Sequence, residues 1–319
     1  MKVAIKWILS TAILAILMYL LSMFILCKVS YKSLPLFYLI MGDYAAPNGG
    51  FTYQTSLDWR DEDVYDVVVL GASRAQRSYN THFFDSVGVH LFNMGSPSQS
   101  LRNSRILLQN HIRENHVREV WLDVVPGLFV DNALESTSDL IQNWTTTSTA
   151  LQMAWESGDT RCINLWMKRL FCENAPDNSG KGIYRGNGYV DVRASLRDDL
   201  MKKWKNKDYG KEQRGYVEFG EEAWKELEKI MIYCQAQHIQ LRLVASPVSV
   251  FNNQHDQQAM NARLETMVMK YAIPFYDYSS RQEWKTTEHF YDEKHMNSAG
   301  VKLFNKDLVE KIYRNLKRS

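Results

Sequence analysis

The chain has 319 residues, of which 45% are hydrophobic and 23% are charged, so it is large enough to bury a full core. Its 38 Lys and Arg residues nearly balance its 36 Asp and Glu residues, and this near-neutral charge argues against a nucleic-acid-binding protein. The composition also argues against a disordered or repeat protein and indicates one large domain or a domain with a sizeable insertion.

The first predicted element is a transmembrane helix. Residues 7–27 are uncharged and mostly Leu, Ile, Ala and Met, and at helical rise they span a hydrocarbon core of about 30 Å. Lysines flank the run on both sides, so the flanking charge does not decide its orientation. The short tail before it and the large domain after it favour an N-terminus on the cytoplasmic side. A cleaved signal peptide is the alternative, but the run is long for one and lacks a clear cleavage site. We therefore expect a retained anchor over residues 1–28 and a main domain outside the cytoplasm, in the periplasm or at the cell surface.

A juxtamembrane segment and linker are expected over residues 29–64. Residues 34–41 are apolar but interrupted by Pro35, and they are too few to cross the membrane again. We expect them at the membrane surface or against the domain. Residues 42–58 contain Pro47, Gly49 and Gly50, which is typical of a loop. The globular domain is predicted to cover residues 65–319.

Apolar strands and amphipathic helices alternate through this domain. Five strands are predicted, at residues 67–70, 90–94, 120–125, 241–245 and 274–278. Four helices are predicted, at residues 101–115, 221–237, 257–271 and 298–316. Continuous apolar strands separated by helices indicate a parallel sheet covered on both faces. The predicted fold is therefore a three-layer α/β/α domain of the doubly wound, flavodoxin-like kind.

Residues 132–216 interrupt this alternation and are predicted to form a mostly helical insertion. The segment is too long for an ordinary loop, and it contains helical patches at residues 165–171 and 196–204. Because it leaves from the carboxyl end of a strand, where ligands bind in such sheets, we expect either a roof over the site or a packing elaboration. Three tryptophans in it are candidates for stacking on a sugar or for packing, namely Trp144, Trp155 and Trp166.

The four cysteines are too few for a disulfide scaffold. Cys162 and Cys172 lie ten residues apart, so they either pair in an oxidising compartment or remain separate buried thiols. Cys27 lies in the predicted membrane helix, and Cys234 lies in a predicted helix and is expected in the core. No spacing of cysteine and histidine resembles a zinc site, and neither a metal nor a cofactor is expected.

A serine and a histidine at opposite ends of the domain are the candidate catalytic residues. Ser73 follows the first strand, where a side chain projects from the edge of the sheet, although a serine at such a turn is often only a helix cap. Asp292 and His295 lie on the loop before the last helix, whose predicted N-cap is Asn297. A serine needs a base to take its proton, and the base needs a carboxylate to orient it, which this pair supplies.

Three segments together resemble the SGNH (GDSL-like) hydrolase superfamily. They are VLGASR at residues 69–74, FNMGS at residues 92–96 and DEKHMNSAG at residues 292–300. The resemblance implies an α/β/α fold with Ser73 as nucleophile, His295 as general base and acid, and Asp292 as the residue that orients it. It also implies that the backbone N–H of Gly95 joins that of Ser73 in an oxyanion hole.

The sequence departs from the superfamily pattern at two places. The usual Gly-Asp-Ser is Gly-Ala-Ser here, which leaves the nucleophile unchanged. The Asn donor expected after the third strand is absent, and the acid found there, Asp123, cannot donate to an oxyanion when ionised. Losing one such donor costs about 10²–10³ in rate. The candidate substitutes are Asn93, Arg74 and Arg77, and the two arginines are also candidates for binding an anionic group.

The layout also resembles a membrane-anchored subgroup of envelope proteins, the DltD-type proteins of teichoic acid D-alanylation and the AlgX/AlgJ-type proteins of alginate acetylation. The function expected is a serine esterase or O-acyltransferase that moves an acetyl or other small acyl group on a cell-surface glycan or envelope polymer. Its expected partners are that polymer and a multi-pass membrane acyltransferase. The alternative is a catalytically silent domain of the same kind that binds polymer or scaffolds an envelope-modifying complex.

Overall fold

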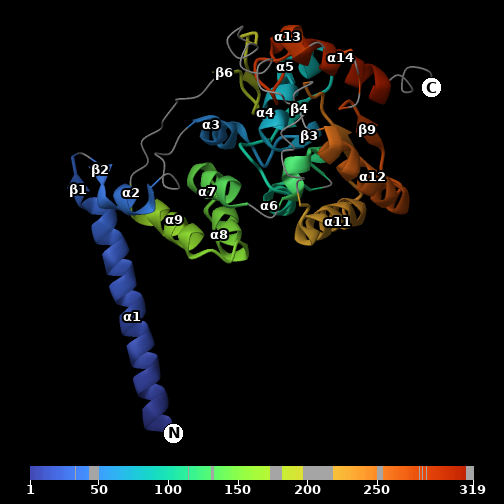
Figure 1. Cartoon of the computed structure of the whole chain (residues 1–319). Helices are drawn as coiled ribbons and strands as arrows, with labels where there is room; N and C mark the ends of the chain where they lie inside the picture. The colour runs from blue at the N-terminus through green and yellow to red at the C-terminus, as the bar shows by residue number, and fades with distance from the viewer. Residues whose placement is uncertain are drawn as a thin grey trace.

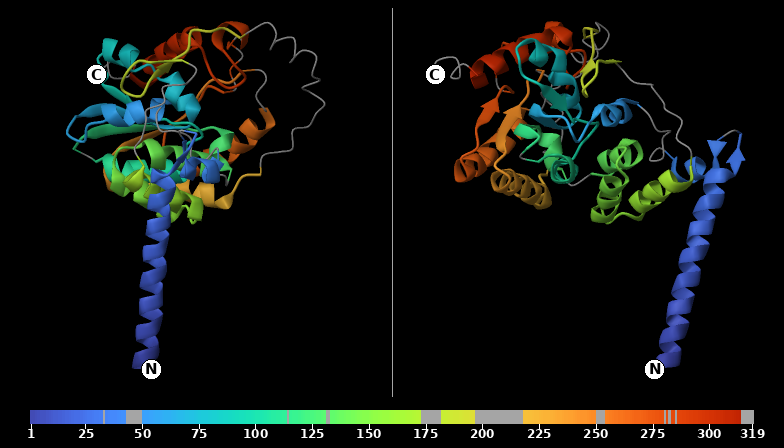
Figure 2. Two further views of the ribbon diagram at one scale, coloured as in Figure 1. Left: turned by 90° about the vertical axis from the view of Figure 1, so that its left-hand side faces the viewer. Right: turned by 180° about the vertical axis from the view of Figure 1, so that it is seen from behind.

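The computed structural model describes residues 1–32, 34–42, 50–113, 115–130, 133–172, 182–196, 218–249, 254–279, 281, 283–284 and 286–313. A long N-terminal helix, α1 (Lys2–Lys28), projects away from a layered α/β domain in every view (Figures 1 and 2). By length and composition α1 is sufficient to cross a membrane. A two-stranded ribbon and a short helix follow it, namely β1 (Ser30–Tyr31), β2 (Leu34–Pro35) and α2 (Leu36–Met41).

The centre of the domain is a five-stranded parallel sheet in the order β4-β3-β5-β8-β9. Its strands are β3 (Tyr65–Gly71), β4 (Leu91–Asn93), β5 (Val117–Asp123), β8 (Gln240–Ala245) and β9 (Phe275–Asp277). In order along the chain the strands are therefore arranged 2-1-3-4-5, which is the flavodoxin-like arrangement. All five predicted strands and the predicted fold class are confirmed.

Helices cover both faces of the sheet because its strands are apolar on both sides. Val68 and Leu70 of β3 face one core, and Val67 and Val69 face the other. The first core is closed by α6 (Leu101–His111), α11 (Glu221–Ala236) and α12 (Gln254–Tyr271). The second is closed by α4 (Ser73–Ser78), α5 (Thr81–Ser86) and α14 (Ser298–Tyr313). Figure 1 shows α4, α5 and α14 above the sheet and α6 and α11 below it.

The insertion between β5 and α11 consists of two different parts in its described residues. Its helices follow the 3-10 turn η2 (Pro126–Phe129) and are α7 (Leu134–Asn143), α8 (Thr147–Glu156) and α9 (Thr160–Phe171). They pack on one another and against α6 and α1. The second part is a small hairpin of β6 (Ile183–Tyr184) and β7 (Val190–Asp191). Most of the helical patch predicted at residues 196–204 lies outside the described residues.

Part of the predicted linker is a helix, α3 (Gly50–Asp58), which packs against α7. Thr52 donates a hydrogen bond to Asp139, and Ser56 donates one to the carbonyl of Asn143. Glycine and proline at the start of this segment indicated a loop, but the buried contacts with α7 stabilise a helix after them. Residues 43–49 of the predicted linker lie outside the described part.

A disulfide joins Cys27, near the C-terminal end of α1, to Cys172, which follows α9. The predicted alternative of a Cys162–Cys172 pair is therefore wrong, because Cys162 is a buried free thiol. The two predicted partners lie at opposite ends of α9, whereas packing of α9 on α1 brings Cys27 next to Cys172. Cys234 is a buried free thiol on α11, as predicted.

Candidate active site

Ser73 lies at a sharp turn from β3 into α4. Gly71 ends the strand with φ at +147°, and a Cβ there would lie 2.9 Å from the Cβ of Ala75 and 3.0 Å from the carbonyl oxygen of Asp123. Only glycine fits this close turn. Ala72 is the N-cap and Ser73 is the first helical residue, so its hydroxyl is not used as the cap considered from the sequence. Its N–H also has no acceptor within the helix.

Asp292 and His295 lie on a polar loop between two buried apolar residues, Phe290 and Met296. These two residues pair in an antiparallel bridge and enter the core beside α14, which holds both ends of the loop. The side chain of Asn297 accepts hydrogen bonds from the first free N–H groups of α14, so the predicted N-cap is confirmed. The bridge and the N-cap therefore hold the loop at both of its ends.

The structure brings the three predicted catalytic side chains together. The hydroxyl of Ser73 lies 2.8 Å from Nε2 of His295, and Nδ1 of His295 lies 2.8 Å from Oδ2 of Asp292. The other carboxylate oxygen, Oδ1, accepts hydrogen bonds from the backbone N–H groups of Lys294 and His295, each at 2.8 Å. Nδ1 also lies 3.0 Å from Oδ1, so both carboxylate oxygens face it and hold the imidazole with Nδ1 protonated, which leaves Nε2 free to accept a proton from Ser73.

Burial and charge adjust both titratable members of this group. Burial lowers the pKa of His295, and the nearby Arg77 and Arg74 lower it further against the opposing effect of Asp292. Burial raises the pKa of Asp292, but hydrogen bonds and the charge of His295 outweigh this and leave it below its usual value. The carboxylate is therefore ionised and the imidazole neutral at pH 7, as a general base must be.

Arg74, which follows Ser73 in α4, is buried, and the charges of two carboxylates act on it. Burial lowers its pKa, whereas the charges of Asp123 and Asp292 raise it. Asp123 is fully buried at the end of β5 and accepts a hydrogen bond from the N–H of Ser246. Burial raises the pKa of Asp123 to about 6, against the effects of Arg74 and Ser246. The acid at the place of the missing Asn therefore lies beside Arg74 and is held by β8.

Gly95 and Asn93 are placed differently from the oxyanion hole expected from the sequence. The N–H of Gly95 donates to the side-chain oxygen of Asn93 at 2.9 Å, and the amide nitrogen of Asn93 donates to the carbonyl of Ala75 at 2.7 Å. The N–H of Gly95 and one of the two N–H groups of the Asn93 amide are therefore engaged within the protein. A Cβ on Gly95 would lie 2.6 Å from the backbone nitrogen of Gln76. The glycine is required here for the close approach of the loop after β4 to α4.

Two features of the site were not predicted. The ring of Tyr291 stacks on the imidazole of His295, with centroids 5.7 Å apart and planes 12° apart. The β6–β7 hairpin joins the start of α14, where the N–H of Ser298 donates to the carbonyl of Val192 and its hydroxyl donates to Asp191. Tyr291 directly precedes Asp292, but its sequence position does not show which way its ring points.

The insertion meets the neighbourhood of the site through this hairpin, whereas its helices pack toward α6 and α1. Of the three tryptophans proposed for sugar stacking, Trp144 is buried and donates to His111. Trp166 is half-buried on α9, and Trp155 on α8 is 78% exposed. The packing alternative is therefore correct for Trp144, whereas Trp166 lies on α9, which packs on α1, and Trp155 lies on α8, which packs on α9.

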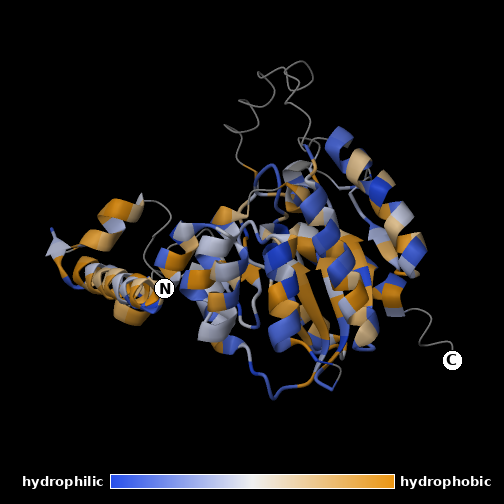
Figure 3. Cartoon of the chain, turned by 90° about the horizontal axis from the view of Figure 1, so that it is seen from below, coloured by the Kyte–Doolittle hydropathy of each residue, from blue (hydrophilic) through white to orange (hydrophobic). Residues whose placement is uncertain are grey.

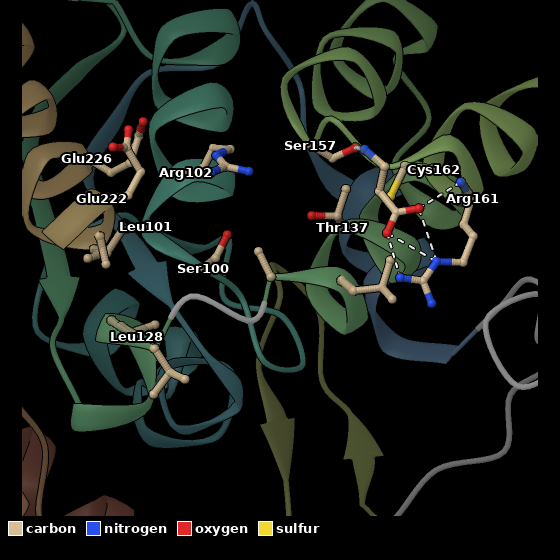
Figure 4. A pocket seen from close by; sticks show the side chains of 15 residues that line it. Ser100, Leu101, Arg102, Leu128, Thr137, Ser157, Arg161, Cys162, Glu222 and Glu226 are labelled. Carbon is tan, nitrogen blue, oxygen red and sulfur yellow. Dashed lines mark hydrogen bonds and ion pairs between the residues drawn. The ribbon is translucent and has the colours of Figure 1, made fainter. Parts of the chain in front are cut away.

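A cavity of about 490 Å³ lies away from the three catalytic candidates, between α6, α11 and the insertion (Figure 4). Arg102 and Glu222 face it from one side and Arg161 from the other, and Asp159, which also lines it, forms an ion pair with Arg161. Neither Ser73 nor His295 is among its lining residues. Across the part of the chain that the structure describes, no group of three His, Cys, Asp or Glu residues is placed to hold a metal.

No protein-family model and no curated protein matches this chain. Among solved structures, it is similar to a protein of Bacteroides fragilis assigned as an acylhydrolase, with 14% identity, 91% of this chain and 100% of that chain covered, and a TM-score of 0.41. A GDSL-like lipase from Bacteroides thetaiotaomicron shares 12% identity over 85% and 99% of the two chains, with a TM-score of 0.39. A lipase/acylhydrolase from Enterococcus faecalis shares 11% identity over 78% and 96%, with a TM-score of 0.41. These scores are too low to support an inference, so the fold rests on the strand order and the site on its own geometry.

Proposed function

We propose that this chain is a membrane-anchored serine esterase or O-acyltransferase of the SGNH-like kind. The observation that carries the proposal is the line of hydrogen bonds from Ser73 through His295 to Asp292, each 2.8 Å long. These three residues come from opposite ends of the domain. An activated serine forms and breaks esters, so acyl chemistry is the reaction class that this geometry supports best.

In the proposed mechanism the hydroxyl oxygen of Ser73 attacks the carbonyl carbon of an ester while Nε2 of His295 takes its proton. The tetrahedral intermediate then expels the alcohol, which receives that proton from His295, and the acyl group remains on Ser73. Water or a sugar hydroxyl next gives its proton to His295 and attacks the acyl carbon. The second intermediate then expels the oxygen of Ser73, which takes the proton back from His295. The acyl group leaves on water or on the sugar, which completes hydrolysis or transfer.

Stabilisation of the negatively charged intermediate is assigned to the N–H of Ser73 and the cationic surroundings. Arg74 and Arg77 both lower the pKa of His295, so their positive charges contribute to the electrostatic potential at the imidazole next to Ser73. The same charge favours an oxyanion or an anionic substrate at Ser73. Gly95 contributes its N–H only if its hydrogen bond to Asn93 breaks.

The proposed location is the outer side of a membrane, with α1 as a single span and its N-terminus inside. The Cys27–Cys172 disulfide supports this orientation because disulfides persist in oxidising compartments. For the acceptor we propose a hydroxyl of a cell-surface glycan or envelope polymer, by analogy with the envelope proteins whose layout this chain resembles. A multi-pass acyltransferase is the proposed donor of the acyl group.

The test is hydrolysis of p-nitrophenyl acetate by the full-length protein in detergent. We expect Ser73→Ala and His295→Ala to lose nearly all of the turnover, because each removes a partner in the proton transfer. Ser86→Ala is the matched control, since Ser86 is exposed and its hydroxyl bonds only a carbonyl within its own helix turn. Equal turnover by all four proteins would refute the assignment of Ser73 and His295.

A second candidate function is a silent domain of the same fold that binds polymer or scaffolds a complex. The engaged N–H of Gly95 favours it, because a site with too few oxyanion donors is slow. A fluorophosphonate probe separates the two functions, since it modifies only an activated serine. Stoichiometric labelling of Ser73 supports the enzyme, and absence of labelling supports the silent domain.

A further inference from the structure

α9 packs obliquely against the outer part of α1. Besides the Cys27–Cys172 disulfide, the rings of Phe24 and Phe171 meet edge to face at 5.9 Å. Further toward the N-terminus of α1, the hydroxyl of Tyr19 donates to the side chain of Asn164. These three contacts fix α9 beside the last turns of α1, so the height of the insertion relative to the anchor is determined.

These contacts place part of the domain at membrane depth if α1 crosses the bilayer as proposed above. Tyr19 precedes Cys27 by eight residues, which is about 12 Å along the helix axis. The apolar stretch of α1 is only long enough to fill the hydrocarbon core, so its last turns lie in the outer leaflet. Figures 1 and 2 show the turn between α8 and α9 on the side of the domain that faces the N-terminus of α1, below the level at which α1 ends.

Large apolar side chains are exposed on these two helices. Trp155 near the end of α8 is 78% exposed, and Leu151 lies one turn before it on the same face and is 40% exposed. Leu170 on α9 is 51% exposed. A tryptophan with an apolar ring and a polar N–H is the side chain most typical of the boundary between lipid and water. Seen from below, hydrophobic and hydrophilic segments alternate over this side of the domain, which fits a boundary better than the hydrocarbon interior (Figure 3).

We propose that α8 and α9 form a second membrane contact, in which Trp155, Leu151 and Leu170 insert into the outer leaflet beside α1. The inference rests on the proposed membrane span of α1 and is independent of the chemistry at Ser73. The disulfide and the α1–α9 contacts then prevent the domain from turning freely about its anchor. The domain lies with its α8–α9 side on the bilayer, and α14 lies on the opposite side.

The test uses the full-length chain in phosphatidylcholine nanodiscs and an environment-sensitive fluorophore on one cysteine. One variant carries the substitution Trp155→Cys, and the matched control carries Leu303→Cys on α14, where the native side chain is 48% exposed. The unsubstituted chain measures background labelling of the native cysteines. Nitroxide-bearing lipid is expected to quench the label at position 155 more than the label at 303, by about twofold or more. Unchanged thermal midpoints show that both variants are folded.

Equal quenching at the two positions would overturn the proposal. The exposed apolar side chains of α8 and α9 would then be assigned to contact with a protein partner. Alkaline carbonate extraction of native membranes tests the anchor separately. Chain retained in the membrane pellet together with equal quenching refutes the second contact alone. Chain released into the supernatant refutes both the span and the second contact, and neither result affects labelling of Ser73.

Discussion

The substitution Asp292→Asn tests the site most sharply because it changes one atom of the hydrogen-bond line. Oδ1 of Asp292 accepts two backbone N–H groups, so the oxygen of the new amide is held in that place. The NH₂ group must then occupy the position of Oδ2, which at 2.8 Å is the nearer of the two oxygens to Nδ1 of His295, whereas Oδ1 lies at 3.0 Å. Since NH₂ only donates, its hydrogen points at the ring nitrogen, which favours Nδ1 as the acceptor and moves the imidazole hydrogen to Nε2. A protonated Nε2 cannot take the proton of Ser73.

The expected loss in kcat/KM is about 10³–10⁴, by comparison with the corresponding change in a serine protease. At 1.36 kcal/mol for each factor of ten, this equals about 4–5.5 kcal/mol of transition-state stabilisation. Little loss of stability is expected, because the backbone hydrogen bonds to the side-chain oxygen remain. The measurement is p-nitrophenyl acetate hydrolysis between pH 5 and 9, together with thermal denaturation.

The matched control is Glu265→Gln, which makes the same carboxylate-to-amide change on the exposed surface of α12. It is expected to keep the activity of the native protein. If Asp292→Asn also kept more than about a tenth of the native kcat/KM, the imidazole would not depend on Asp292 for its tautomer. The proposed role of Asp292 would then be wrong even with Ser73 confirmed as nucleophile.

Three other outcomes follow from the geometry. Activity is expected to rise as the pH passes the pKa of His295, which lies below the ordinary value for histidine. Arg77→Gln removes a cation that disfavours the charged imidazole, so it raises this pKa and moves the rise in activity to higher pH. A pH–rate profile that Arg77→Gln leaves unchanged would contradict this. Gly95→Ala lowers stability by about 1–3 kcal/mol through overpacking, measured by denaturant unfolding, and a native midpoint would show that α4 moves freely. Peptide mapping without reductant recovers Cys27 linked to Cys172 and the other two cysteines as thiols, whereas any other pairing contradicts the packing of α9.

The predicted strands and the catalytic candidates depended on signals that are local in sequence. An apolar run of four to seven residues ending in glycine, as at Val67–Gly71, indicates a buried strand and the turn after it. Parallel strands bring their carboxyl ends to one edge, so the sequence predicted that the strand ends come together, but it did not show that Ser73 and His295 meet. Their separation of 2.8 Å required the structure.

The features that were missed depend on tertiary contacts. The pairing of Cys27 with Cys172 follows from the packing of α9 on α1, which no spacing within α9 indicates. The bond from Gly95 to Asn93 depends on the side-chain conformation of Asn93, which also reaches the carbonyl of Ala75. Motif resemblance indicates where such groups lie, but it does not show which hydrogen bonds they already make.

Ser73 and His295 are separated by 222 residues, which has a consequence for folding. Contacts between segments so far apart form late, because closing a long loop costs entropy before any contact offsets it. Helical signal would therefore return early in a refolding experiment, whereas labelling of Ser73 by a fluorophosphonate would return only when the loop before α14 has docked. The reactivity of this one hydroxyl would thus report the last stage of assembly of the domain.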